Sequence, residues 1–186
     1  MKKIIEEKEI KYIINKSKFI GLIFNVYEIE DIKNILSNLK QKYNDATHIC
    51  YAYIINEFKR YNDDKEPTAG LPILNILESN NLNYVLCVVI RYFGGIKLGI
   101  GGLSRAYSNT CKLCLENNIK DLEYGFKVTI EFNYDEINKI DFLLKNNKII
   151  DKVFDKKITY TFLINEKEFE TIKNNLNIIK KTSIII

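Results

Sequence analysis

The 186-residue chain has 46% hydrophobic residues, 28% charged residues and only two prolines, which is typical of a folded globular protein and excludes disordered or fibrous classes. Its net charge of +4 is compatible with nucleic acid or acidic partners but is too small to indicate them by itself. The N-terminal segment mixes acidic and basic residues, and no apolar stretch is long enough to span a membrane. We therefore expect a cytoplasmic protein without a membrane partner, whose four cysteines stay reduced.

The first half of the chain alternates strand and helix patterns. Strands are predicted where polar and apolar residues alternate or β-formers gather, at residues 8–14, 16–27, 47–55 and 83–93. Helices are predicted where apolar residues recur at helical spacing, at residues 28–43, 68–80 and 103–117. The first two strands are compatible with a hairpin, and the polar stretch 60–67 is predicted as a turn.

The second half of the chain repeats a simpler order after an acidic linker around residues 121–127. Strands are predicted at residues 127–132, 148–154, 157–164 and 181–186, and amphipathic helices at residues 134–147 and 165–176. The resulting β-α-β-β-α-β order is that of a ferredoxin-like domain. We therefore predict an α+β protein of two separately folded domains, residues 1–122 and 123–186.

Residues 91–105 form a glycine-rich segment between a buried strand and a helix. Glycines beside a helix N-terminus let a ligand approach free backbone N–H groups, and nearby cations favour a phosphate or carboxylate. The spacing matches neither a dinucleotide-binding fingerprint nor a P-loop, and the glycines could equally serve positive φ angles and tight packing. The predicted anion-binding residues are Arg91, Gly94, Gly95, Lys97, Gly99, Gly101, Gly102 and Arg105.

A second polar cluster precedes the helix at residues 68–80. Asp63, Asp64 and Glu66 form an acidic turn (residues 63–67) that could hold Mg²⁺, but aspartates capping the next helix are the more favoured interpretation. His48, the chain's one histidine, could complete a zinc site with three of the cysteines, yet a buried structural imidazole and reduced core thiols explain the same residues. We therefore assign no catalytic residue and expect neither a bound metal nor a cofactor.

Four stretches together resemble the IMPACT/YigZ family in its bacterial two-domain form. They are KSKFIG at residues 16–21, ATHICYAY at 46–53, NDDKEPTAGLPIL at 62–74, and VVIRYFGGIKLGIGGLSRAYSNT at 88–110. The resemblance implies a first domain similar to domain 2 of ribosomal protein S5, a ferredoxin-like second domain, and a link to translation. It also marks His48, Asp63, Asp64 and Glu66 as motif positions.

Two departures from the family pattern lie in the acidic turn. Lys65 stands where the family usually has glycine, and two residues usually found between Pro67 and Thr68 are absent. A shared binding role is therefore expected first on the glycine-rich segment.

Two functions follow as hypotheses. The first is a translation-associated regulatory protein that contacts RNA, the ribosome or a protein partner through the glycine-rich segment. The alternative is an enzyme acting on a phosphorylated small molecule, with the acidic turn holding a divalent metal opposite Arg91 and Arg105. An open basic groove favours binding, whereas a closed pocket that joins the acidic turn to the glycine-rich segment favours the enzyme.

Overall fold

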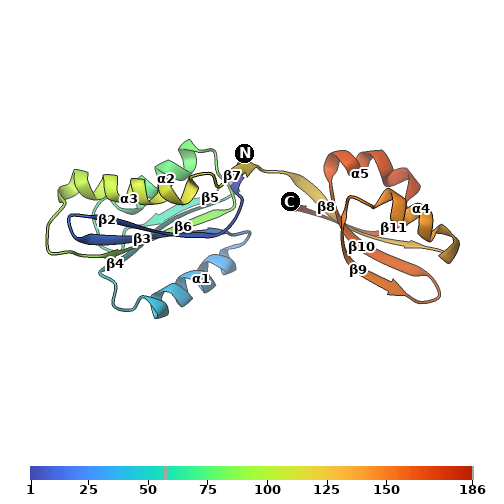
Figure 1. Cartoon of the computed structure of the whole chain (residues 1–186), viewed down its shortest axis with the longest axis horizontal. Helices are drawn as coiled ribbons and strands as arrows, with labels where there is room; N and C mark the ends of the chain where they lie inside the picture. The colour runs from blue at the N-terminus through green and yellow to red at the C-terminus, as the bar shows by residue number, and fades with distance from the viewer. Residues whose placement is uncertain (57, 186) are drawn as a thin grey trace. The chain divides into compact units, whose positions relative to one another are not determined.

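The computed structural model describes residues 1–56 and 58–185. The chain divides into two compact units, Met1–Asp121 and Leu122–Ile186, and each is described by itself. Figure 1 shows that each unit has its own sheet and its own helices, so the protein has the α+β class expected from the sequence.

The first unit is built on a five-stranded antiparallel sheet with the order β2-β3-β6-β4-β5. Its strands are β2 (Lys8–Ile14), β3 (Ser17–Asn25), β4 (His48–Ile55), β5 (Phe58–Asn62) and β6 (Val85–Tyr92). The central strand β6 is buried along both faces up to its last residue, as its continuous apolar run predicts. β2 and β3 form the hairpin that the sequence indicated.

Helices cover both faces of this sheet. In Figure 1, α2 (Gly70–Ser79) and α3 (Gly99–Leu115) lie on one face and α1 (Ile29–Lys42) lies on the other. α1 begins with a capping box in which the side chains of Glu28 and Asp31 bond each other's backbone N–H groups. α2 and α3 bury their apolar sides in one core with alternate residues of β3, β4 and β6.

Several elements differ from the prediction. Residues 60–62, predicted as turn, belong to β5, an edge strand whose five residues are all exposed and therefore lack a hydrophobic signature. α3 begins at Gly99 rather than at residue 103, because the chain turns into the helix within the glycine-rich segment. β1 (Lys2–Ile4) and β7 (Ile119–Asp121) pair in a separate ribbon too short to give a periodic pattern.

The second unit has the predicted β-α-β-β-α-β order. Its strands are β8 (Tyr124–Phe132), β9 (Lys148–Phe154), β10 (Ile158–Asn165) and β11 (Ile178–Ile185), arranged antiparallel in the order β11-β8-β10-β9. Two short 3₁₀ turns, η1 (Tyr134–Glu136) and η2 (Lys173–Asn175), adjoin helices α4 (Ile137–Leu143) and α5 (Glu166–Ile172). Both helices cover one face of the sheet (Figure 1), where the second core lies. The other face is left bare.

Across residues 1–56 and 58–185, every helix is too short or too polar to cross a bilayer.

Candidate functional site

The register of the first sheet brings the two main motifs together. His48 at the start of β4 pairs directly with Arg91 near the end of β6, although the sequence separates them widely. The acidic turn follows β5 and leads into α2, and the glycine-rich segment leads from β6 into α3. The start of β4, the end of β6, the acidic turn and the glycine-rich segment therefore meet at one end of the sheet.

A buried ion pair lies at the centre of this site. Arg91 Nη1 donates a hydrogen bond to Glu66 Oε2, and the two residues are only 5% and 6% exposed. The Tyr107 hydroxyl, on α3, donates to the same oxygen at 3.3 Å. The guanidinium also lies over the rings of Phe19 and Phe93, at 5.7 and 5.5 Å. This ion pair thus joins the acidic turn, β6 and α3.

The imidazole of His48 is held between the acidic turn and this ion pair. Its Nδ1 lies 2.9 Å from the carbonyl oxygen of Asp64. Because a carbonyl can only accept, Nδ1 must carry the proton. Nε2 then lies 3.5 Å from Glu66 Oε2. The ring orientation is therefore fixed, with Nε2 directed toward the buried carboxylate.

The two aspartates of the acidic turn have structural partners. Asp63 Oδ1 accepts the backbone N–H groups of Ala69 and Gly70 at 3.0 and 2.6 Å, so it caps the start of α2. Asp64 Oδ2 accepts the N–H of Ile49 at 2.8 Å. Within the described ranges, no three His, Cys, Asp or Glu side chains are grouped so as to hold a metal ion. The capping interpretation of the sequence therefore accounts for Asp63.

All four cysteines are reduced and buried. Burial raises the pKa of the Cys50 thiol to about 12. Its Sγ donates to the carbonyl of Asp63 at 3.1 Å and contacts the Tyr107 hydroxyl at 3.6 Å. The pKa of Cys114 is raised by its hydrogen bond with Cys87 and by burial. These thiols are core groups packed behind the site.

The glycines of the glycine-rich segment have different roles. A Cβ on Gly94 would lie 2.0 Å from the carbonyl carbon of Lys16, so this glycine lets the β2–β3 turn pack against the segment. Gly95 and Gly99 have φ values of +85° and +69°, and a Cβ on either would meet open space. The last two of these glycines, Gly101 and Gly102, lie in the first turn of α3.

One cavity of about 350 Å³ opens above the ion pair. It joins the acidic turn to the glycine-rich segment but is open to solvent. Exposed Lys97 lies at its edge, whereas exposed Arg105 lies one helical turn beyond Gly101 and outside the cavity lining. Its lining residues are Thr47, His48, Glu66, Arg91, Phe93, Lys97, Leu98, Gly99, Ile100 and Leu103.

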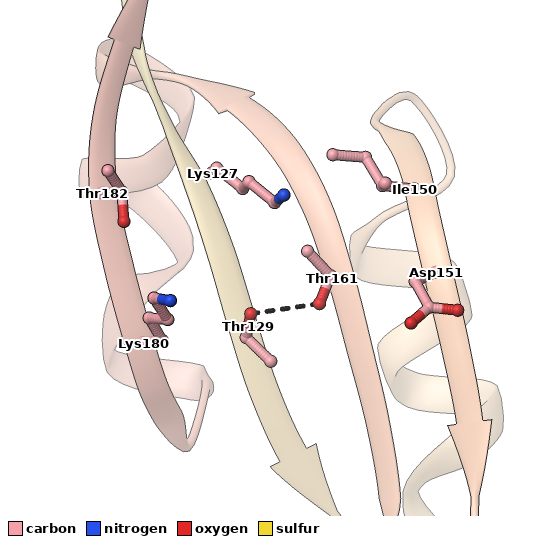
Figure 2. A pocket seen from close by; sticks show the side chains of 7 residues that line it. All are labelled: Lys127, Thr129, Ile150, Asp151, Thr161, Lys180 and Thr182. Atoms are coloured by element: carbon pink, nitrogen blue, oxygen red, sulfur yellow. Dashed lines mark hydrogen bonds between the residues drawn. The ribbon is translucent and has the colours of Figure 1, made fainter.

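The second unit has a larger hollow of about 730 Å³ on its bare sheet face. Figure 2 shows side chains from all four strands on this face, with the helices behind the sheet. Thr129 and Thr161 share a 3.0 Å hydrogen bond at its centre. Lys127 and Lys180 form no ion pair with any side chain in the described part of the chain.

We call the residues that line this hollow the open sheet face: Lys127, Thr129, Ile150, Asp151, Thr161, Lys180 and Thr182. The strand periodicity could have indicated them, but the sequence prediction did not include them.

Comparison with known proteins identifies relatives of this chain. Residues 15–115 match the Impact N-terminal domain. An IMPACT family member of Haemophilus influenzae is 32% identical over 93% of this chain and 87% of its own length. The Bacillus subtilis IMPACT family member YvyE is 42% identical over 56% of this chain and 51% of its own length. A crystal structure of a hypothetical protein, 24% identical, has the same fold, with a TM-score of 0.62 over 95% of both chains.

Proposed function

Because the chain belongs to the IMPACT family, we propose that it is a translation-associated regulatory protein that binds RNA, alone or on the ribosome. Family membership supports the link to translation. The choice of RNA rests on the geometry of the glycine-rich segment, which presents donors and positive charge at an open surface.

The observation that carries this proposal is the uncovered start of α3 beside Lys97. In the described structure, the residue that precedes the helix is Leu98, which offers no capping oxygen, and the first turn contains no acidic residue. The first N–H groups of a helix lack intrahelical acceptors, and the helix dipole makes this end positive. A phosphate of RNA can approach here because Gly95 and Gly99 leave open space.

The cations contribute differently from the sequence-based expectation. Arg91 is buried and paired with Glu66, so it supports the site from within. Lys97 and Arg105 are exposed and can neutralise phosphates directly. The proposed contact surface therefore consists of Lys97, Arg105 and the first turn of α3.

The open sheet face of the second unit supports a second contact with the same partner. Its two lysines, which form no ion pair in the described part of the chain, and its threonine hydroxyls are suitable donors to phosphate oxygens (Figure 2). Among the residues that line this hollow there is no aromatic side chain. Base stacking is therefore not expected there, and the contact would be to the sugar–phosphate backbone, without sequence preference.

The test is binding of the full chain to single-stranded RNA and to ribosomes at two salt concentrations. Lys97→Ala should weaken RNA binding by up to about fivefold, because an exposed ionic contact contributes up to about 1 kcal/mol. Lys127→Ala with Lys180→Ala should also weaken binding and reduce its salt dependence. Lys40→Ala, an exposed lysine of α1, is the matched control and should bind as the wild type does.

The contrary outcome is also definite. If RNA and ribosomes bind without salt dependence, or bind all four proteins equally, the phosphate contact is wrong. If the folded protein binds neither RNA nor ribosomes, the RNA proposal is wrong, and a protein partner would have to account for the family's link to translation.

A further inference from the structure

We infer that the cavity beside the glycine-rich segment binds a terminal phosphate, the end group of a phosphomonoester, rather than a phosphate within a continuous strand. A phosphate at the start of α3 is also part of the proposed function, on which this inference rests. What is new is the kind of phosphate and the depth at which it binds. The ligand could be the end of an RNA or a small phosphorylated molecule, since both present the same group.

The start of α3 supplies the first set of donors. Gly99 and Ile100 line the cavity, and no side chain in the described structure caps this 17-residue helix. By contrast, Asp63 caps α2 and Asn165 caps α5. The N–H groups of the first turn of α3 are therefore available to an acceptor in the cavity.

The buried arginine is independent evidence for an anion. Arg91 lines the cavity, is 95% buried, and gives only Nη1 to Glu66. Its Nε has no hydrogen-bond partner in the described part of the chain. The protein therefore satisfies only part of the hydrogen-bonding capacity of the guanidinium, and a buried donor without a partner costs free energy. Because Arg91 lines the cavity, an oxyanion there would place further negative charge beside a guanidinium whose hydrogen bond within the described residues is the one from Nη1 to Glu66.

The charges around the cavity favour an anion even though Glu66 lines it. Glu66 is neutralised by Arg91 and also accepts from the Tyr107 hydroxyl. Among the described residues, Lys97 forms no ion pair and the first turn of α3 holds no acidic residue, so neither positive charge is compensated. His48 also lines the cavity, and its ring is oriented by the hydrogen bond between Nδ1 and the Asp64 carbonyl.

The size and rim of the cavity favour an end group. A volume of about 350 Å³ is at the small end of the range for small-molecule sites. The rim includes Phe93 and Ile100, which are 46% and 66% exposed. A terminal phosphate can enter past them and leave its sugar or base against the apolar rim. A phosphate inside a strand carries a substituent on both sides and would have to stay at the mouth.

The experiment uses the full chain and one RNA oligonucleotide in three forms: 5′-hydroxyl, 5′-phosphate and 3′-phosphate. Adenosine monophosphate and inorganic phosphate are tested alongside, with affinity measured by titration and the bound position by NMR shifts of the Gly99 amide. A phosphorylated end should raise affinity at least about fivefold over the 5′-hydroxyl form. Inorganic phosphate should compete with it and shift the Gly99 signal.

Two variants separate the cavity from the surrounding surface. Lys97→Ala should reduce the preference for the phosphorylated end to twofold or less, because Lys97 lines the cavity. Arg105→Ala removes an exposed cation outside the cavity and should lower the affinity for all three oligonucleotides while keeping the preference.

The outcomes distinguish this inference from the proposed function. Equal binding of the three oligonucleotides, with no effect of inorganic phosphate on Gly99, overturns the terminal-phosphate site while leaving RNA binding intact. Binding of adenosine monophosphate and inorganic phosphate without RNA supports the cavity as a small-molecule site and overturns the RNA proposal. Binding of neither phosphate nor RNA by the folded protein overturns both.

Discussion

The pairing of Arg91 with Glu66 gives the sharpest prediction about stability. Replacing Arg91 by Met keeps a long side chain over Phe19 and Phe93 but removes the charge that faces the buried carboxylate. Glu66 would then be left 6% exposed beside the Tyr107 hydroxyl at 3.3 Å and the His48 imidazole at 3.5 Å, without the arginine charge. Removing one partner of a buried ion pair typically costs about 3 to 5 kcal/mol.

That cost is large compared with the whole stability of a domain, which is about 5 to 15 kcal/mol. With a urea slope of about 1.5 kcal/mol per molar, the unfolding midpoint of the first unit should fall by about 2 to 3 M. Glu66→Leu combined with Arg91→Met removes both charges, so the double variant should recover at least about 2 kcal/mol relative to the sum of the single variants.

The assay is urea unfolding of the full chain, followed through the NMR amide signals of β6. These signals make the free energy refer to the first unit and avoid mixing it with the second. If Arg91→Met lowers the free energy of unfolding by less than about 1 kcal/mol, the pair contributes no more than a solvent-screened surface salt bridge, and the reasoning from burial is wrong. A strictly additive double variant would show that the two charges do not stabilise each other.

Three further predictions concern the backbone and the thiols, and each is checked by unfolding measurements. Gly94→Ala should destabilise the first unit by about 3 kcal/mol because its methyl group would overlap the backbone of the β2–β3 turn, whereas Gly95→Ala should cost only about 1 kcal/mol for its φ of +85°. Lys65 and Thr68 have φ values of +64° and +61°, which strain residues that carry a Cβ. Replacing either by Gly should therefore raise the free energy of unfolding by about 1 kcal/mol, and a lower free energy of unfolding would contradict this explanation. The pKa of Cys50 is raised from 9.0 to about 12, so the stabilising contribution of this thiol is complete below pH 9 and should decline by about 1.4 kcal/mol per pH unit up to pH 12. Cys50→Ala should therefore reduce the loss of stability at alkaline pH, and an unchanged profile in this variant would contradict the prediction.

The sequence predicted most elements because their periodic patterns and their burial agree. The run at residues 83–93 was assigned correctly as a strand buried on both faces, since β6 lies in the middle of the sheet. β5 was missed because its side chains are exposed, and hydrophobic periodicity reports only burial. The start of α3 was placed late because glycines have low helix propensity, while here they occupy a first turn where φ and packing decide the conformation.

Parts of the candidate site could not be derived from local patterns. The sequence singled out both Glu66 and Arg91, but in separate roles: Glu66 as a motif position or metal ligand, and Arg91 as an anion-binding cation. Their pairing depends on the antiparallel register of β4 with β6 and on the path of the acidic turn, which are long-range features. The role of Lys65 was visible only as a departure from the family's glycine, and its positive φ supplies the physical reason for that preference.

The buried ion pair also determines how the site should be probed. Through Arg91, Glu66 and Tyr107, it connects three segments that form the floor and walls of the cavity. A substitution in this group changes the shape of the cavity and the stability of the first unit together, so lost binding would not identify a ligand contact. Lys97 and Arg105 are exposed, and their removal leaves the ion pair in place. Differences in binding between variants of these two residues therefore report on the ligand itself, because the folded site beneath them stays the same.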